Sequence, residues 1–269
     1  MKRSFLWVLL AAVAVLFSSA CGGGGGSSSN TGNTTATSGD TGLSNTSIIT
    51  SLDNGAGFGV DLSDLAVGDQ VQLRVIGINS SGQNVIQNGS NWTTTAPASV
   101  ATVTPTGLLT AVGPTGGTSY LVSGRGPNGT LSANLIIKQP QAFVTGLVRN
   151  VNGTGIPRVS ISFYNSSNAL VGKALTGAQG TFRANLAPTA TRFTIDIEAS
   201  DPGNNPIYYR QFSYTPPSSS GALDYLEGGT SCLASMPAIT SGSTVQLSDI
   251  TLIDRASGPP PPPSGCLGG

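Results

Sequence analysis

The stretch Ser99–Val112 reads SVATVTPTGLLTAV and decides the fold of this chain. Its two halves, Ser99–Val103 and Thr106–Val112, are rich in β-branched and apolar residues, which favour strands. Pro105 marks a break between them, and Gly107 supplies the positive φ that a tight hairpin needs. We therefore predict two adjacent short strands here.

The same pattern continues on both sides of this stretch. Val71, Leu73 and Val75 share one face of a strand, because side chains in a strand alternate with a period of two. A later strand face consists of Leu131, Ala133, Leu135 and Ile137. Short strands at this spacing, with Gly or Pro at the breaks, are typical of a β-sandwich. Residues 48–139 are predicted to form the first such domain of an all-β chain.

These residues resemble a known family. Trp92, Val100–Val103, Gly107, Leu109–Val112 and Gly116–Thr118 fit the pattern of group 2 bacterial immunoglobulin-like domains, which occur in invasin- and intimin-type surface proteins. The resemblance implies an immunoglobulin-like sandwich with Trp92 packed between its sheets. An exposed Trp92 that serves as a platform for a sugar is the alternative.

Residues 140–254 give a second set of strand patterns. Their order resembles the carboxypeptidase regulatory-like domain, whose pattern matches Gly146–Val148, Gly153–Pro157, Thr176–Phe182 and Leu186–Pro188. The resemblance implies a seven-stranded sandwich related in shape to transthyretin. It implies no catalytic residues.

An irregular insertion is predicted over residues 201–242 of this second domain. Pro, Gly and Ser are frequent in it, and it also holds Tyr208, Tyr209, Tyr214 and Tyr225. One interpretation is that the insertion packs on its own sandwich. The other is a binding surface for a protein or glycan, since tyrosine offers contact area at low entropic cost.

The N-terminal residues 1–20 are predicted to be a signal peptide. Lys2 and Arg3 precede the apolar run Phe5–Phe17, whose 13 residues are too few for a membrane-spanning helix. The sequence around Ala20 and Cys21 resembles a bacterial lipoprotein signal, in which the cysteine receives the lipid. Ordinary cleavage after Ala20 is the alternative.

Residues 21–47 are predicted to be a flexible tether, because Gly, Ser, Thr and Asn dominate them and cannot bury a core. The residue after Cys21 is Gly22, not the aspartate that retains lipoproteins at the inner membrane of enteric bacteria. By this resemblance, the expected location is the outer membrane or the cell surface, with the lipid anchor as the contact to the membrane.

Charge excludes one class of partner. Cleavage after residue 20 would remove Lys2 and Arg3, leaving 10 basic and 12 acidic residues and a net charge of −2. Such a chain has no electrostatic basis for binding nucleic acid.

Two cysteines remain if Cys21 carries a lipid. Cys232 and Cys266 are then expected to pair in an oxidising compartment. The bridge would close a loop of 34 positions and stabilise the fold by roughly 3.5–4 kcal/mol. It would tie the Pro-rich C-terminal tail, residues 255–269, to the second domain.

The residues that carry most enzyme chemistry are missing. The chain has no histidine, which excludes Ser-His and Cys-His nucleophile pairs and histidine-ligated metals. The run Gly124–Gly129 matches a dinucleotide-binding fingerprint, but an alternating strand follows it instead of a helix, so a hairpin turn is predicted. Asp53, Asp61, Asp64 and Asp69 form a loose acidic cluster. These residues are interpreted as parts of solvated loops, and calcium binding is the less favoured alternative.

The sequence thus predicts a chain without enzyme activity or cofactor. The first hypothesis is a lipid-anchored surface protein that acts as an adhesion, scaffold or spacer module. The second is a carbohydrate- or peptide-binding accessory module that uses Trp92 or the tyrosines of the insertion. A hydrolase is the third and least favoured.

Overall fold

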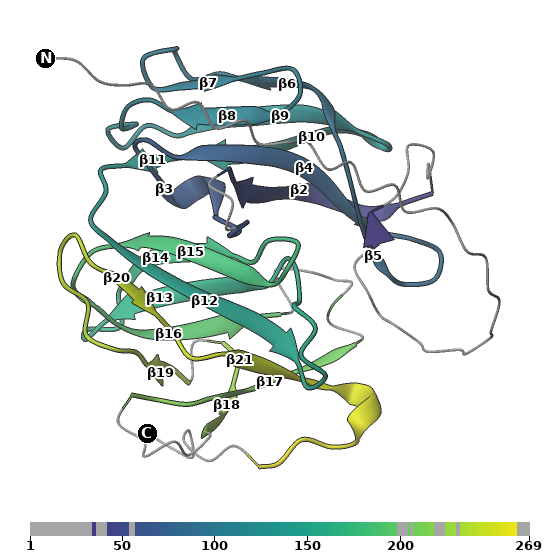
Figure 1. Cartoon of the computed structure of the whole chain (residues 1–269), viewed down its shortest axis with the longest axis vertical. Coiled ribbons are helices and arrows are strands. Elements are labelled where there is room, and N and C mark those ends of the chain that lie inside the picture. Colours follow the sequence, from purple (N-terminus) through teal and green to yellow (C-terminus); the bar gives the residue numbers. More distant parts are fainter. Residues whose placement is uncertain are drawn as a thin grey trace, which may run out of the picture. The chain divides into compact units, whose positions relative to one another are not determined.

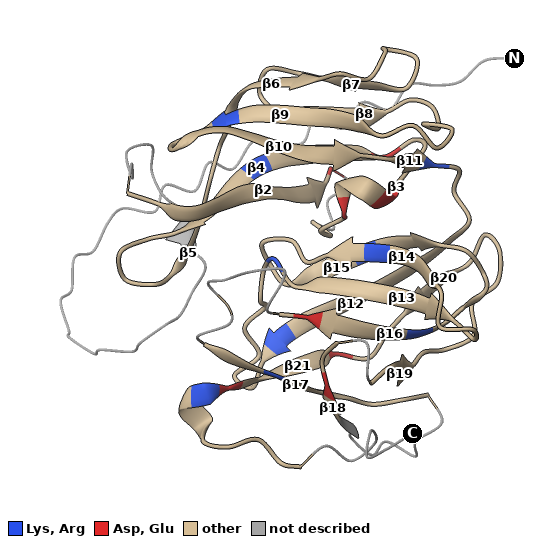
Figure 2. Ribbon diagram, turned by 180° about the vertical axis from the view of Figure 1, so that it is seen from behind, with Lys and Arg blue, Asp and Glu red and all other residues tan. Residues whose placement is uncertain are grey.

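The computed structural model describes residues 34–35, 42–53, 57–197, 204, 207–217, 224–229 and 232–262. All of them belong to one compact unit that begins at Gly32. The predicted signal peptide, Cys21 and most of the predicted tether lie outside the described residues. The regular secondary structure of the described part consists of β-strands and two short 3-10 helices, and the strands form two consecutive β-sandwiches. Figure 2 shows how few charged residues these strands carry.

The first sandwich contains the strands β1 to β11 and the helix η1 (Figure 1). They are β1 (Thr34–Thr35), β2 (Ser44–Leu52), η1 (Leu62–Asp64), β3 (Leu65–Ala66), β4 (Gln70–Ile78), β5 (Asn84–Gln87), β6 (Ser90–Thr94), β7 (Ala101–Val103), β8 (Leu108–Ala111), β9 (Tyr120–Gly126), β10 (Gly129–Leu135) and β11 (Ile137–Lys138). One sheet has the order β1-β5-β4-β8-β7, with β2 also paired to β4, and a second has the order β10-β9-β6. β11 pairs with β3 in a small third sheet.

The predicted strand pair is confirmed. β7 and β8 pair antiparallel with Ala101 opposite Ala111, and Gly107 in the turn has a φ of 93°. The predicted face of β4 is also confirmed, because Val71, Leu73 and Val75 are all buried in the core between the sheets.

The first sandwich begins earlier than predicted. β1 (Thr34–Thr35) pairs with β5, and β2 starts at Ser44, where it pairs with the end of β4, so Thr34–Thr35 and Ser44–Ser47 of the predicted tether belong to strands. The polar sequence of these residues gives no hydrophobic signal, since their place is fixed by backbone hydrogen bonds to β5 and β4.

The second sandwich contains the strands β12 to β21 and the helix η2. They are β12 (Ala142–Asn150), β13 (Ser160–Asn165), β14 (Leu170–Leu175), β15 (Thr181–Leu186), β16 (Ala190–Asp196), β17 (Tyr208–Tyr214), β18 (Asp224–Glu227), β19 (Ala234–Ser235), β20 (Thr244–Gln246), β21 (Ile250–Asp254) and η2 (Arg255–Ser257). One sheet has the order β15-β12-β21-β17-β18, with β20 also on β12, and the facing sheet has the order β14-β13-β16-β19.

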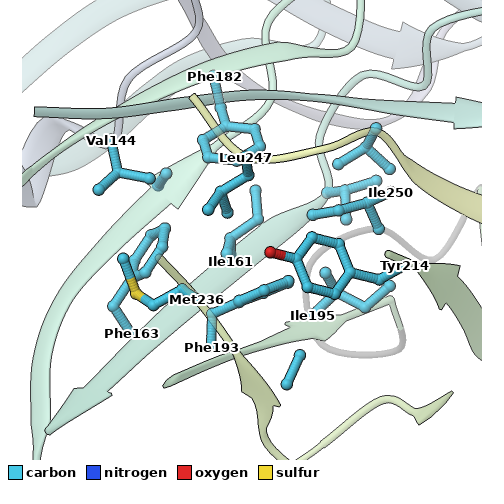
Figure 3. Packing of buried hydrophobic residues seen from close by; sticks show 14 of the residues in the cluster. Val144, Ile161, Phe163, Phe182, Phe193, Ile195, Tyr214, Met236, Leu247 and Ile250 are labelled. Carbon is cyan, nitrogen blue, oxygen red and sulfur yellow. The ribbon is translucent and has the colours of Figure 1, made fainter. Parts of the chain in front are cut away.

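An aromatic cluster fills the core of the second sandwich (Figure 3). The ring of Phe193 lies 6.3 Å from that of Phe163 and meets Tyr214 edge-on at 4.9 Å, measured between ring centroids. Phe182 extends the cluster from β15 at 6.4 Å from Phe163. Tilted and edge-to-face pairs of this kind add to the stabilisation from burial.

The irregular insertion predicted over residues 201–242 contains three strands of this sandwich. β17 pairs with β21 and β18, and β19 pairs with β16. Phe212 and Tyr214 of β17 are fully buried. The segment therefore belongs in large part to the two sheets, as the packing interpretation expected.

Candidate functional site

Trp92 is the first of the aromatic candidates, and it lies in the core. Its side chain is 3% exposed and belongs to the buried cluster of the first sandwich. Three glycines frame the indole: a Cβ atom on Gly89, Gly107 or Gly124 would come closer than 3.0 Å to it. Packing of Trp92 between the sheets is thus confirmed, and the indole face is not available as a platform for a sugar.

The four tyrosines of the second domain do not form a common exposed surface. Tyr208 and Tyr214 are buried in the core. Tyr209 is half-buried, and the guanidinium of Arg255 lies over its ring at 4.9 Å from the centroid. Tyr225 lies in β18, and its side chain is outside the described residues. The strand is irregular between Tyr208 and Phe212, where its register against β21 shifts, and the residues buried at its end are Phe212, Ser213 and Tyr214.

Burial of two tyrosines leads to a prediction about alkaline pH. Burial raises the pKa of Tyr208 to about 12 and also raises the pKa of Tyr214 above its ordinary value. A raised pKa in the folded state means that the neutral phenol stabilises the fold. This contribution to stability is fully present below the unfolded pKa of about 10 and is lost as the pH rises through the folded pKa. These phenols should therefore ionise at higher pH than exposed tyrosines. We expect a phenolate absorbance titration to show Tyr208 still protonated at about pH 11. A titration without any late-ionising tyrosine would contradict the burial.

Three of the four acidic residues predicted as a loose cluster have separate structural roles, and the fourth, Asp53, lines the cavity described below. Asp61 caps η1 by accepting the backbone N–H of Ser63 at 2.8 Å. Asp64 is paired with Lys138, and Asp69 is paired with Arg183 of β15. Among the described residues, no group of three or more acidic or cysteine side chains could hold a metal ion. The arrangement is built for structural contacts between strands.

Asp64 is the most buried of these carboxylates, with a side chain only 2% exposed. Its carboxylate accepts hydrogen bonds from the ammonium of Lys138 and from the backbone N–H of Lys173, the latter at 3.1 Å. Burial raises the pKa of Asp64 to about 6, the neighbouring charge of Asp61 acts in the same direction, and Lys138 opposes the rise. The neutral carboxyl is thus favoured by folding.

This burial predicts how stability depends on pH. The folded pKa of Asp64 lies above its unfolded value, so its contribution to stability is fully present below the unfolded pKa of about 4 and is lost as the pH rises through the folded pKa of about 6. We expect Asp64→Asn to reduce the loss of stability between pH values of about 4 and 7.5, as measured by urea unfolding at both. Identical pH profiles of the variant and the wild type would contradict the assignment.

The glycine-rich run Gly124–Gly129 forms a hairpin turn, as predicted. β9 and β10 pair antiparallel with Gly126 opposite Gly129, and a strand follows the turn. The dinucleotide-binding alternative fails because it requires a helix at this place.

A cavity of about 250 Å³ lies beside β2, β4 and β5. Ile49 and Ile86 give it an apolar wall, and Gln72 and Arg74 contribute polar atoms. None of the tyrosines or the tryptophan predicted as binding residues lines it. The sequence offered no signal for this cavity, because Ala178, far along the chain, also lines it.

The predicted modification and disulfide sites are described only in part. Cys232 is buried, whereas Cys21 and Cys266 lie outside the described residues. No helix in the described ranges is long and apolar enough to cross a membrane.

Comparisons with known proteins give only distant similarity. No family model and no curated protein matches the chain. Among solved structures, it is similar to the TIE protein of Bacillus anthracis (TM-score 0.24, 9% identity, 78% of this chain and 52% of that one). It is also similar to BcpA, the major pilin subunit of Bacillus cereus (TM-score 0.23, 8% identity, 77% of this chain and 70% of that one). A third similar structure is the T6 backbone pilin of serotype M6 Streptococcus pyogenes (TM-score 0.24, 10% identity, 78% of this chain and 70% of that one). The chain spans about half of the first of these proteins. The assignment of an all-β, two-sandwich fold therefore rests on the chain's own strands.

Proposed function

We propose that this chain is a non-enzymatic protein of the bacterial cell envelope, anchored by a lipid on Cys21, whose two sandwiches act as an adhesion, scaffold or spacer module. One observation carries the proposal: the large aromatic side chains that a binding site would use are packed in the cores. Trp92, Tyr208 and Tyr214 are all buried. Such interiors favour a module that works through its shape and its outer surface.

The sequence resemblances support the same proposal. The first sandwich is proposed to be a group 2 bacterial immunoglobulin-like domain, and the second a carboxypeptidase regulatory-like domain. A signal peptide and a tether before them would hold both domains away from an outer membrane or cell surface.

The anchor can be tested by metabolic labelling with a palmitate analogue. We expect label on the wild-type chain and none on Cys21→Ser, with both chains expressed at similar levels. An unlabelled wild-type chain would exclude the anchor and leave a secreted protein.

A binding module for glycans or peptides is the second candidate. The half-buried Tyr209 favours it, because Tyr209, unlike Tyr208 and Tyr214, lies outside the core, and tyrosine offers contact area at low entropic cost. A glycan and peptide array with the wild type and Tyr209→Ala separates the two functions. Binding that disappears in a folded Tyr209→Ala protein would favour this candidate, and the absence of binding would favour the first.

The disulfide between Cys232 and Cys266 is part of the proposal. We expect alkylation without reduction to leave both thiols unmodified, and alkylation after reduction to modify them. Reduction should lower the free energy of unfolding by roughly 3.5–4 kcal/mol, from the entropy of a loop of this length. Two free thiols in the native protein would contradict the pairing.

A further inference from the structure

The segment Gly57–Val60 of the first sandwich pairs with the edge of β15 in the second. The N–H of Gly59 donates to the carbonyl of Thr181 at 3.0 Å, and the N–H of Arg183 donates to the carbonyl of Gly59 at 2.8 Å. Gly59 and Phe182 thereby form a parallel β-bridge. A piece of the first sandwich thus extends a sheet of the second and covers its edge.

The two backbones approach closely at this bridge. A Cβ atom on Gly59 would come closer than 3.0 Å to the carbonyl oxygen of Leu175 and to Gly177. All the atoms it would meet first belong to the second sandwich. Glycine at position 59 is therefore required by the junction and not by the packing of the first sandwich itself.

One ion pair and one hydrogen bond also cross the junction. Asp69 pairs with Arg183, and both side chains are largely buried, at 7% and 13% exposed. The guanidinium of Arg183 also lies 4.4 Å from the ring centroid of Phe143. Asp64 accepts a hydrogen bond from the backbone N–H of Lys173 in β14. A charge left buried without its partner is costly, so replacing one member of the Asp69–Arg183 pair should weaken the junction.

We propose that this junction makes the two β-sandwiches one cooperative unit, so that neither unfolds without the other. The β-bridge at Gly59, the close backbone contact of Gly59 with Gly177 and the buried Asp69–Arg183 ion pair all have to be broken before one sandwich can open alone. The inference concerns the junction alone, and it holds whether or not the chain is displayed on a surface.

The chain contains its own probes for a test. Trp7 lies in the predicted signal peptide, so the chain from Cys21 onward has Trp92 as its single tryptophan, which reports on the first sandwich, while five of the six tyrosines lie in the second domain. We expect tryptophan fluorescence and tyrosine near-ultraviolet circular dichroism to give coincident urea transitions in this chain. Two separate transitions would overturn the proposal.

A variant in the core of the second sandwich tests whether the two transitions are coupled or only happen to have the same midpoint. Ile195→Ala weakens only the second sandwich directly, because Ile195 is buried in its core. We expect both transitions to move together, by about 1 M urea. A shift of the tyrosine signal alone would show independent domains.

Variants of the junction complete the test. Gly59→Ala should separate the two transitions, because the added methyl group collides only with the second sandwich. Where Gly59→Ala does not fold, Arg183→Gln gives the same readout, and Arg149→Gln serves as its control because the pair of Arg149 with Asp249 is half-exposed and lies within the second sandwich. Coincident transitions in the junction variant would contradict the role of the junction.

Discussion

Phe193→Ala is expected to lower the free energy of unfolding by about 4 kcal/mol. Phe193 is fully buried, and its ring contacts those of Phe163, Phe212 and Tyr214 in the centre of the second sandwich. These neighbours come from both sheets, so the cavity left by the phenyl ring cannot collapse without moving strands. Urea unfolding followed by far-ultraviolet circular dichroism measures the effect.

The matched control for this variant is Leu170→Ala in β14. Leu170 is 50% exposed, so its truncation should change the stability by less than about 0.5 kcal/mol. Equal effects of the two substitutions would contradict the described core.

Trp92→Ala is expected to have an effect of similar size, about 4 kcal/mol, on the first sandwich. The indole is buried, and Gly89, Gly107 and Gly124 approach it so closely that a methyl group on any of them would collide with it. Backbone held this close cannot move in to fill the space that the indole leaves. Far-ultraviolet circular dichroism is again the measurement, since the variant has lost its fluorescent probe.

Two comparisons decide whether Trp92 acts as a core residue. Val112→Ala changes a side chain that is 47% exposed and should have little effect on stability. Gly124→Ala should destabilise the chain although it leaves the indole intact, because the added Cβ overlaps the ring. A fully stable Trp92→Ala protein that loses binding to a sugar would contradict the account.

The fold class could be predicted from the sequence because local patterns carried it. The period-two alternation of Val71, Leu73 and Val75 defines a buried strand face, and Gly107 defines a turn that requires a positive φ. Such signals depend only on neighbours in the chain.

Other strands could not be predicted, because distant partners define them. Gly172 interrupts the pattern of β14, yet a Cβ atom there would meet Leu186 and Asp64, so the glycine is required by packing. In β17 the register shifts between Tyr208 and Phe212, and Arg210 between them is exposed, so a period of two would not have placed Tyr208 in the core. The frequent Pro, Gly and Ser on both sides of the strand also hid it.

The junction between the two sandwiches could not be predicted from the sequence either. Asp64 and Asp69 look like members of a solvated acidic cluster, because their partners Lys138 and Arg183 lie far along the chain. The pairing of Gly59 with β15 places Asp69 next to Arg183 and Asp64 next to the backbone of Lys173, both in the second sandwich. Ion pairs between segments this distant leave no local pattern in a single sequence.

Protease treatment of intact cells tests the central claim most directly. If the two sandwiches are displayed outside the cell on a lipidated tether, protease should release the folded part from intact cells at the glycine- and serine-rich residues 22–33, while a cytoplasmic marker stays whole. Cys21→Ser should instead appear in the medium. A wild-type chain that stays protected in intact cells and is cleaved only after lysis would contradict surface display.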